Sequence, residues 1–192
     1  MGGPGGRSRR GAARSAVRPT LARVRDALFN ALAALLPGAR VLDLYAGSGA
    51  LGLGALSRGA SRAVLVERDR RLAARLRRRI RQEGWQSRAE VWQADAVAAV
   101  RRLGDRGERF EVVVMDPPYG RGLLQPTLQA VAEAGILAPG GVVVAEGHWR
   151  DRPAEVRGLR CTREARYGET RVWYFRQAEG GGDDGGGVSG KL

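Results

Sequence analysis

The chain has 192 residues, 43% of them hydrophobic, and a net charge of +13. This length favours one domain with a substantial core, and no apolar stretch approaches the roughly 18 residues that a membrane span needs. The N-terminus lacks the apolar segment of a secretory signal, so we expect a cytoplasmic protein without a membrane partner. All basic residues except Lys191 are arginines, which bind phosphate in a bidentate way and stack on bases, so the charge favours a nucleic-acid partner.

The two ends of the chain differ in composition from the middle. Residues 1–17 are rich in Gly, Ala, Arg and Ser without periodicity, which predicts a basic, flexible arm. Residues 178–192 are Gly-rich and predict a disordered tail, so we expect one domain over 18–177. The single Cys161 excludes an internal disulfide and is expected to be a small core residue of a strand. The sequence contains no cluster of His and Cys residues that would indicate a metal site.

Between these ends the hydrophobic pattern alternates between helices and strands. Thr20 can cap a helix that ends at Pro37-Gly38. Further helices are predicted at 50–58, 69–83, 96–103 and 123–135, and strands at 40–45, 63–67, 89–93, 110–116 and 141–146. Two final strands, near 161–166 and 171–175, predict a hairpin around Tyr167-Gly168-Glu169.

This order of elements predicts an α/β fold with a doubly wound, mostly parallel sheet of seven strands. The closing hairpin implies an antiparallel C-terminal strand at the edge of the sheet. In the helix at 69–83, Leu72, Leu76 and Ile80 are spaced by four and predict a buried face, whereas its many arginines are expected to face solvent. The only histidine, His148, follows the fifth predicted strand and is expected at the surface.

A Gly-rich loop follows the first strand and predicts a nucleotide-cofactor site. Its sequence is Ala46-Gly47-Ser48-Gly49-Ala50-Leu51-Gly52, in which Gly47, Gly49 and Gly52 have the G-x-G-x-x-G spacing. The glycines turn the chain tightly and let backbone approach a ligand that a Cβ would exclude. Glu67 ends the next strand, where its carboxylate can accept hydrogen bonds from both ribose hydroxyls. These features fit NAD as well as S-adenosylmethionine.

Two aspartates favour S-adenosylmethionine over NAD. Asp43 lies inside the first strand, where a buried acid is costly unless a partner satisfies it. The amino group of a methionine moiety is one such partner, and backbone amides of the loop are the alternative. Asp95 follows the third strand and can accept a hydrogen bond from the adenine amino group. Its alternative role is to cap the helix that begins at Ala96, and both roles can hold together.

The tetrapeptide Asp116-Pro117-Pro118-Tyr119 ends the fourth strand and is typical of a site for an exocyclic base amine. Such an amine is a poor nucleophile because its lone pair is delocalised into the ring. The Asp116 carboxylate and the Pro117 carbonyl can accept its two hydrogens, which favours a pyramidal nitrogen with an available lone pair. The prolines stiffen the turn, and Tyr119 offers a face on which the base can stack.

These residues resemble the RsmD family of methyltransferases over about 17–175. Besides the tetrapeptide and the loop with the strand before it, the resemblance rests on Arg18-Pro19-Thr20, Arg23-Val24-Arg25-Asp26-Ala27-Leu28-Phe29-Asn30, Ala55-Leu56-Ser57-Arg58-Gly59-Ala60, Glu67 with Asp69, and Tyr167-Gly168-Glu169-Thr170. It implies a class I, Rossmann-like methyltransferase fold and S-adenosylmethionine as methyl donor. It also implies that the substrate is the N2 amine of a guanine in 16S ribosomal RNA, guanine 966, during assembly of the small subunit.

The resemblance also assigns residues to the contact with RNA. By analogy the segment around Arg18 and Thr20 closes over the cofactor and substrate, and Arg23 belongs to the same family segment. Arg121 follows the catalytic motif, so its loop is expected to meet the RNA. We expect the enzyme to act as a monomer on 16S ribosomal RNA or on a small-subunit assembly particle.

Three other functions fit parts of the sequence. The nearest is methylation of adenine N6 in DNA or another RNA, which would use the same pocket. An NAD-dependent oxidoreductase would use the Gly-rich loop but leaves Asp116 to Tyr119 without a role. A non-catalytic RNA-binding protein would explain the charge but neither the cofactor pocket nor Asp116.

Overall fold

The computed structural model describes residues 18–178, with side chains from Ala22 onward. These residues form five helices and seven strands, which alternate along the chain until the last three strands follow one another. They are α1 (Arg18–Leu32), β1 (Arg40–Asp43), α2 (Gly52–Leu56), β2 (Arg62–Val66), α3 (Arg70–Gln82), β3 (Ala89–Trp92), α4 (Ala96–Asp105), β4 (Phe110–Met115), α5 (Leu124–Glu133), β5 (Leu137–His148), β6 (Leu159–Tyr167) and β7 (Thr170–Gln177). The predicted arm (1–17) and almost all of the predicted tail (178–192) lie outside the described residues.

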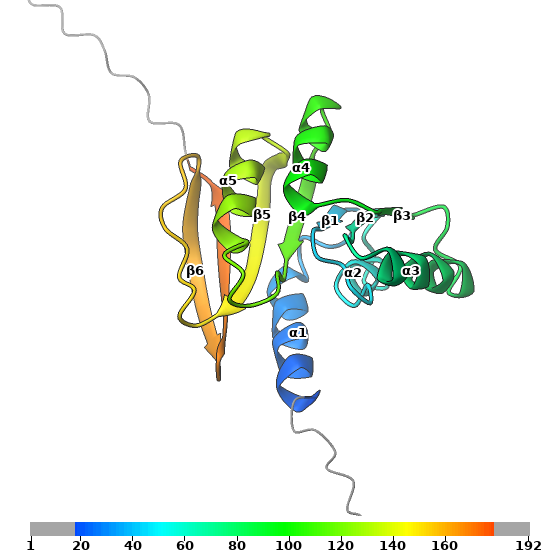
Figure 1. The fold of residues 1–192 in the computed structure, drawn as a ribbon, viewed down its shortest axis with the longest axis horizontal. Coiled ribbons are helices and arrows are strands. Elements are labelled where there is room, and N and C mark those ends of the chain that lie inside the picture. The colour runs from blue at the N-terminus through cyan, green and yellow to red at the C-terminus, as the bar shows by residue number, and fades with distance from the viewer. Residues whose placement is uncertain (1–17, 179–192) are drawn as a thin grey trace, which may run out of the picture.

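The seven strands form one sheet in the order β3-β2-β1-β4-β5-β7-β6 (Figure 1). The first five of these pair in parallel, and β7 pairs antiparallel with both β5 and β6. Strand β1 has β2 as its neighbour on one side and β4 on the other, so the order of strands changes direction at β1. This is a topological switch point, and the crevice outside the carboxyl ends of the strands at such a point is where α/β sheets bind ligands.

Helices cover both faces of the sheet, and each face buries its own hydrophobic cluster. Strand residues alternate between the faces: Leu42 and Val113 pack with α4 and α5, whereas Val41 and Val112 pack with α1, α2 and α3. Because the parallel strands are buried on both faces, they read as continuous apolar runs in the sequence. The class predicted from the sequence, a doubly wound α/β sheet of seven strands, is confirmed.

Four details differ from the predictions. The antiparallel strand of the hairpin is β7, which lies between β5 and β6 and not at the edge. Cys161 is exposed, because β6 is the edge strand and turns most of its residues to solvent. Leu72 is 37% exposed, because it lies at the wall of the cavity at the carboxyl ends of the strands. Helix α1 begins at Arg18, so Thr20 lies inside its first turn and does not precede the helix as a cap.

No helix between residues 18 and 178 is both long and apolar enough to cross a membrane.

Candidate active site

A cavity of about 1020 Å³ opens at the carboxyl ends of all five parallel strands. Each strand or the residue after it contributes to the wall, because parallel strands place their carboxyl ends at one edge of the sheet. The wall includes Tyr45 after β1, Glu67 after β2, Asp95 after β3, Asp116 after β4 and Glu146 in β5. The chain order of strands and helices thus brings together acidic side chains that are as far apart in the sequence as Glu67 and Glu146.

The Gly-rich loop between β1 and α2 borders this edge, and carboxylates hold its backbone amides. The Gly47 amide donates to Glu67 Oε2 at 2.9 Å, and the Gly52 amide donates to Asp43 Oδ2 at 2.9 Å. Gly47 and Gly49 have positive φ of 50° and 81°, a backbone region that favours glycine. The loop is therefore fixed by hydrogen bonds to the protein's own acids.

We expect Gly49→Ala to destabilise the fold. A Cβ at this position would lie 2.5 Å from Leu76 Cδ1, and φ of 81° adds strain. Overpacking and left-handed strain together predict a loss of about 2–4 kcal/mol of unfolding free energy, measured by urea denaturation. Gly84→Ala is the matched control, because φ is 76° there and nothing lies within 4 Å of the added Cβ. An equal loss in the two variants would contradict close packing at Gly49.

Asp43 is buried in β1, with 1% of its surface exposed. Burial raises the pKa of its carboxyl to about 7, although the Gly52 amide works against this shift, and the nearby Asp116 and Glu67 add to it. Its partner is therefore the loop backbone, which is the alternative weighed from the sequence. The side chain is not among the residues that line the cavity, and its predicted contact with a cofactor stays a prediction.

Glu67 and Asp95 line the cavity and also organise the backbone around it. Glu67 accepts hydrogen bonds from the Gly47 amide at 2.9 Å and the Asp69 amide at 2.7 Å. Each carboxylate oxygen therefore has a lone pair left for a ligand. Asp95 caps α4, with its Oδ1 accepting from Val97 and Ala98, while its side chain remains at the cavity wall.

Asp116 and Glu146 form an acidic pair at the end of the cavity nearest β5. Burial raises the pKa of Asp116 to about 6. Burial, and then the charge of Asp116, raise the pKa of Glu146 to about 7. Because the charge of one carboxylate disfavours ionisation of the other, the two protons dissociate in separate steps. The second ionisation, which gives the pair two negative charges, is disfavoured near neutral pH.

Tyr119 connects this pair to the C-terminal hairpin. Its hydroxyl donates to Glu146 Oε1 at 3.0 Å, and the Thr170 hydroxyl lies 3.1 Å from it and donates in turn. Burial raises the pKa of the Tyr119 hydroxyl, so it remains a donor. The ring is 43% exposed and lies at the cavity wall, where a flat partner can reach it.

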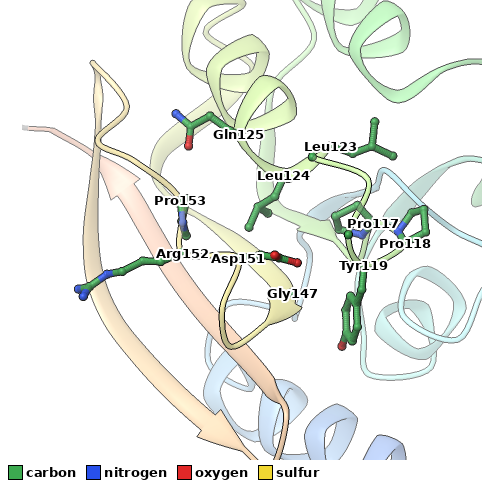
Figure 2. Close-up of a pocket in the computed structure, with 12 residues that line it drawn as sticks. Pro117, Pro118, Tyr119, Leu123, Leu124, Gln125, Gly147, Asp151, Arg152 and Pro153 are labelled. Atoms are coloured by element: carbon green, nitrogen blue, oxygen red, sulfur yellow. The ribbon is translucent and has the colours of Figure 1, made fainter.

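A second chain of hydrogen bonds fixes the segment after the tetrapeptide. Tyr45 donates to Thr127 Oγ1 at 2.7 Å, and Thr127 donates to the Leu123 carbonyl at 2.7 Å. Beyond this segment lies a smaller cavity of about 200 Å³, whose walls also include Asp151 and Arg152. Figure 2 shows Tyr119 at the end of the loop facing this cavity, and Arg152 pointing away from it.

The arginines predicted to meet RNA differ in how the structure places them. Arg121 is exposed and lines the large cavity, between Gly120 and Gly122. Arg23 is exposed on α1 and is not part of the cavity wall. Arg18 and Thr20 belong to α1, but their side chains lie outside what the structure describes. Their predicted role in closing over the site stays a prediction.

Glu146, Thr170 and Tyr45 also belong to the site, although no sequence motif assigns them a role. Glu146 could have been found, because it is an acid at the carboxyl end of a buried strand. Thr170 could not, because its contact with Tyr119 depends on how β7 pairs with β5. Within residues 18–178, no three His, Cys, Asp or Glu side chains are placed so that they could hold a metal ion together.

Comparison with known proteins finds similarity along almost the whole chain. Residues 2–176 match the family described as conserved hypothetical protein 95 (Cons_hypoth95). YlbH of Bacillus subtilis (strain 168) is 34% identical over 174 residues, which cover 90% of this chain and 94% of that protein. Ribosomal RNA small subunit methyltransferase D of Escherichia coli (strain K12) is 39% identical over 130 residues, covering 68% of this chain and 64% of that protein.

A solved structure is also similar. The structure of yhhF from Escherichia coli has a TM-score of 0.75 to this chain at 34% identity. The match covers 82% of this chain and 88% of that one.

Proposed function

The chain belongs to the conserved hypothetical protein 95 family, and we propose that it transfers a methyl group from S-adenosylmethionine to the N2 amine of a guanine in small-subunit ribosomal RNA. The resemblance to RsmD methyltransferases is thereby confirmed at the level of the family. Relatives named ribosomal RNA small subunit methyltransferase D support RNA as the substrate. The observation that carries the proposal is that Asp116-Pro117-Pro118-Tyr119 shares one cavity with Glu67 and Asp95.

The acids of the cavity suit S-adenosylmethionine better than NAD. Glu67 can accept hydrogen bonds from ribose hydroxyls, and Asp95 from the adenine amine. A dinucleotide needs free amides at the Gly-rich loop for its pyrophosphate. Here the amides of Gly47 and Gly52 already donate to carboxylates. When bound, S-adenosylmethionine supplies an electrophilic methyl group on a cationic sulfur, which an acidic cavity favours.

The tetrapeptide then prepares the base. Asp116 Oδ and the Pro117 carbonyl accept the two hydrogens of the amine and hold its lone pair toward the cavity. Once the nitrogen has gained a methyl group it must lose a proton, and the Asp116 carboxylate, already hydrogen-bonded to it, is the acceptor. Preorganised acceptors of this kind need no reorganisation during the reaction, so positioning and electrostatics supply most of the rate enhancement.

Glu146 favours guanine over adenine as the target. Guanine carries an N1–H next to its N2 amine, and a carboxylate can accept that hydrogen. Adenine carries an N1 lone pair next to its N6 amine, and Glu146 in its ionised form repels that lone pair. Because Tyr119 holds Glu146 beside Asp116, a base whose amine binds Asp116 presents its neighbouring ring nitrogen to this second acid.

The test of the proposed function combines binding with transfer. Isothermal titration with S-adenosylmethionine and with NAD separates the cofactors: we expect saturable binding of S-adenosylmethionine only. Tritiated methyl transfer is then measured on small-subunit particles from cells that lack the gene. Saturable binding of NAD alone, or no transfer to RNA in particles or free form, would overturn the proposal.

The activity should depend on pH because Asp116 must be ionised to accept both hydrogens. Since burial raises the pKa of Asp116 to about 6 and that of Glu146 to about 7, kcat/KM should rise with pH through about 6–7 and then level off. In Glu146→Gln the acid with the higher pKa is gone, so the rise should follow Asp116 alone and be complete at lower pH. The exposed Glu155→Gln should leave it in place. An unmoved profile in Glu146→Gln would contradict the coupling of the two acids.

A further inference from the structure

Trp149 and the side chains around it form a surface beside the cavity that the proposed transfer does not use. We call His148, Trp149, Arg150 and Arg166 the Trp149 platform. The first three end β5 or follow it, and Arg166 lies near the end of β6. The Trp149 amide donates to the Glu169 carbonyl at 2.8 Å, which holds the platform against the turn between β6 and β7.

The hydrophobic core does not explain Trp149. Of the four tryptophans, Trp173 is buried, and Trp85 and Trp92 pack against the two core clusters. Trp149 is only partly buried and belongs to neither cluster. A large aromatic ring held at the surface without a packing role suggests a binding function.

Two arginine side chains lie over the Trp149 ring. The guanidinium carbon of Arg166 lies 4.6 Å from the ring centroid and that of Arg150 lies 4.9 Å away. Nearby, Glu164 pairs with Arg152 and Arg171. Within residues 18–178, neither Arg150 nor Arg166 has a carboxylate at ion-pair distance. Their charges are therefore available to an anionic partner.

Aromatic rings link the platform to the catalytic tetrapeptide. The His148 ring lies 5.8 Å from the Trp149 ring and 6.2 Å from the Tyr119 ring, measured between centroids. His148 Nδ1 accepts from the Arg150 amide at 3.3 Å, which fixes the imidazole. Since Tyr119 lines both cavities, a row of rings runs from the active site to the surface.

We propose that the Trp149 platform binds the single-stranded RNA that flanks the target guanine, with one base stacked on Trp149 and phosphates held by Arg150 and Arg166. This inference rests on the proposed function. A base that reacts inside the cavity must leave its stack, so its neighbours are also unstacked and need new partners. Aromatic rings with arginines recognise such bases, whereas a duplex offers only its edges and backbone. When a base stacks on Trp149, the side chains of Arg150 and Arg166 move off the ring and bind the phosphates on either side of that base.

The first test measures stacking. Trp149→Ala is compared with Trp149→Phe, which keeps a ring, on a labelled single-stranded RNA of about 12 nucleotides. Stacking predicts that Trp149→Ala raises Kd about 10-fold and KM for particle methylation similarly, with kcat within about twofold, while Trp149→Phe stays within about threefold of wild type. Equal Kd in Trp149→Ala and wild type, or an equal loss on duplex RNA, would overturn the platform.

The second test measures charge. Arg150→Gln with Arg166→Gln should lower the slope of log Kd against log salt by about 1.4, as expected for two lost phosphate contacts. The matched double variant Arg109→Gln with Arg157→Gln, before the amino ends of β4 and β6, should leave the slope unchanged. Equal slopes in both double variants would overturn the phosphate contacts.

The two proposals fail differently. If the wild type binds RNA but transfers no methyl group to it, the proposed function is wrong, and the binding data still judge the platform. If the wild type methylates RNA while Trp149→Ala has unchanged KM and Kd, the platform alone is wrong.

Discussion

Replacing Asp116 with alanine should lower kcat for methyl transfer by at least about 100-fold, which is the scale of losing one preorganised group that acts in the transition state. We expect the carboxylate to accept a hydrogen from the reacting amine and then to receive its proton, and no other side chain described between residues 22 and 178 lies at the end of β4 to do both. Its partner Glu146 is already hydrogen-bonded to Tyr119. The measurement is tritiated methyl transfer to undermethylated small-subunit particles under saturating conditions.

Asp116→Asn separates charge from shape. An asparagine keeps one acceptor but turns an amide donor toward the amine, so activity should fall by a similar factor. Because burial raises the pKa of Asp116, the ionised acid is costly to the fold, and Asp116→Asn should be at least as stable as wild type at neutral pH. Affinity for S-adenosylmethionine should change only a few-fold in both variants. Activity within a few-fold of wild type would remove Asp116 from the catalytic role.

Replacing Glu67 with alanine should weaken S-adenosylmethionine binding by at least about 150-fold. Hydrogen bonds to a charged group contribute about 1.5–3 kcal/mol each, and Glu67 is expected to accept two from the ribose. The variant also loses the bonds that hold the Gly47 and Asp69 amides, so the loop at the cavity loosens. Isothermal titration measures the change directly.

Glu155→Ala is the matched control for Glu67. It removes an exposed acid that lies outside the cavity wall and has no ion pair among residues 18–178. Its Kd should equal that of wild type. A Kd of Glu67→Ala within about threefold of wild type would show that the ribose does not bind at the end of β2.

The sequence predicts much of this site because the chemistry follows from strand order. Glu67, Asp95 and Asp116 each come at or just after the end of an apolar run, and parallel strands bring those ends to one edge. Any sequence with this alternation places them together, whatever the details of packing. The Gly-rich loop was predictable because its glycine spacing is local, although Glu67 and Asp43 hold its backbone in the fold.

The remaining features depend on pairing that no local pattern encodes. The hairpin around Gly168 is evident from the sequence, but which of its strands joins β5 is decided by packing across the sheet. That choice places Thr170 opposite His148 and thus beside Tyr119. It also leaves β6 at the edge, where Cys161 faces solvent despite lying in a strand.

The central claim is that this cavity methylates a guanine amine in small-subunit ribosomal RNA. Its most direct test is mass-spectrometric mapping of that RNA from cells lacking the gene, complemented with wild type or with Asp116→Ala. We predict that one N2-methylguanosine is missing without the gene, returns with wild type and stays missing with the variant. A full set of guanine modifications in the deletion strain, or a missing methyladenosine instead, would contradict the account.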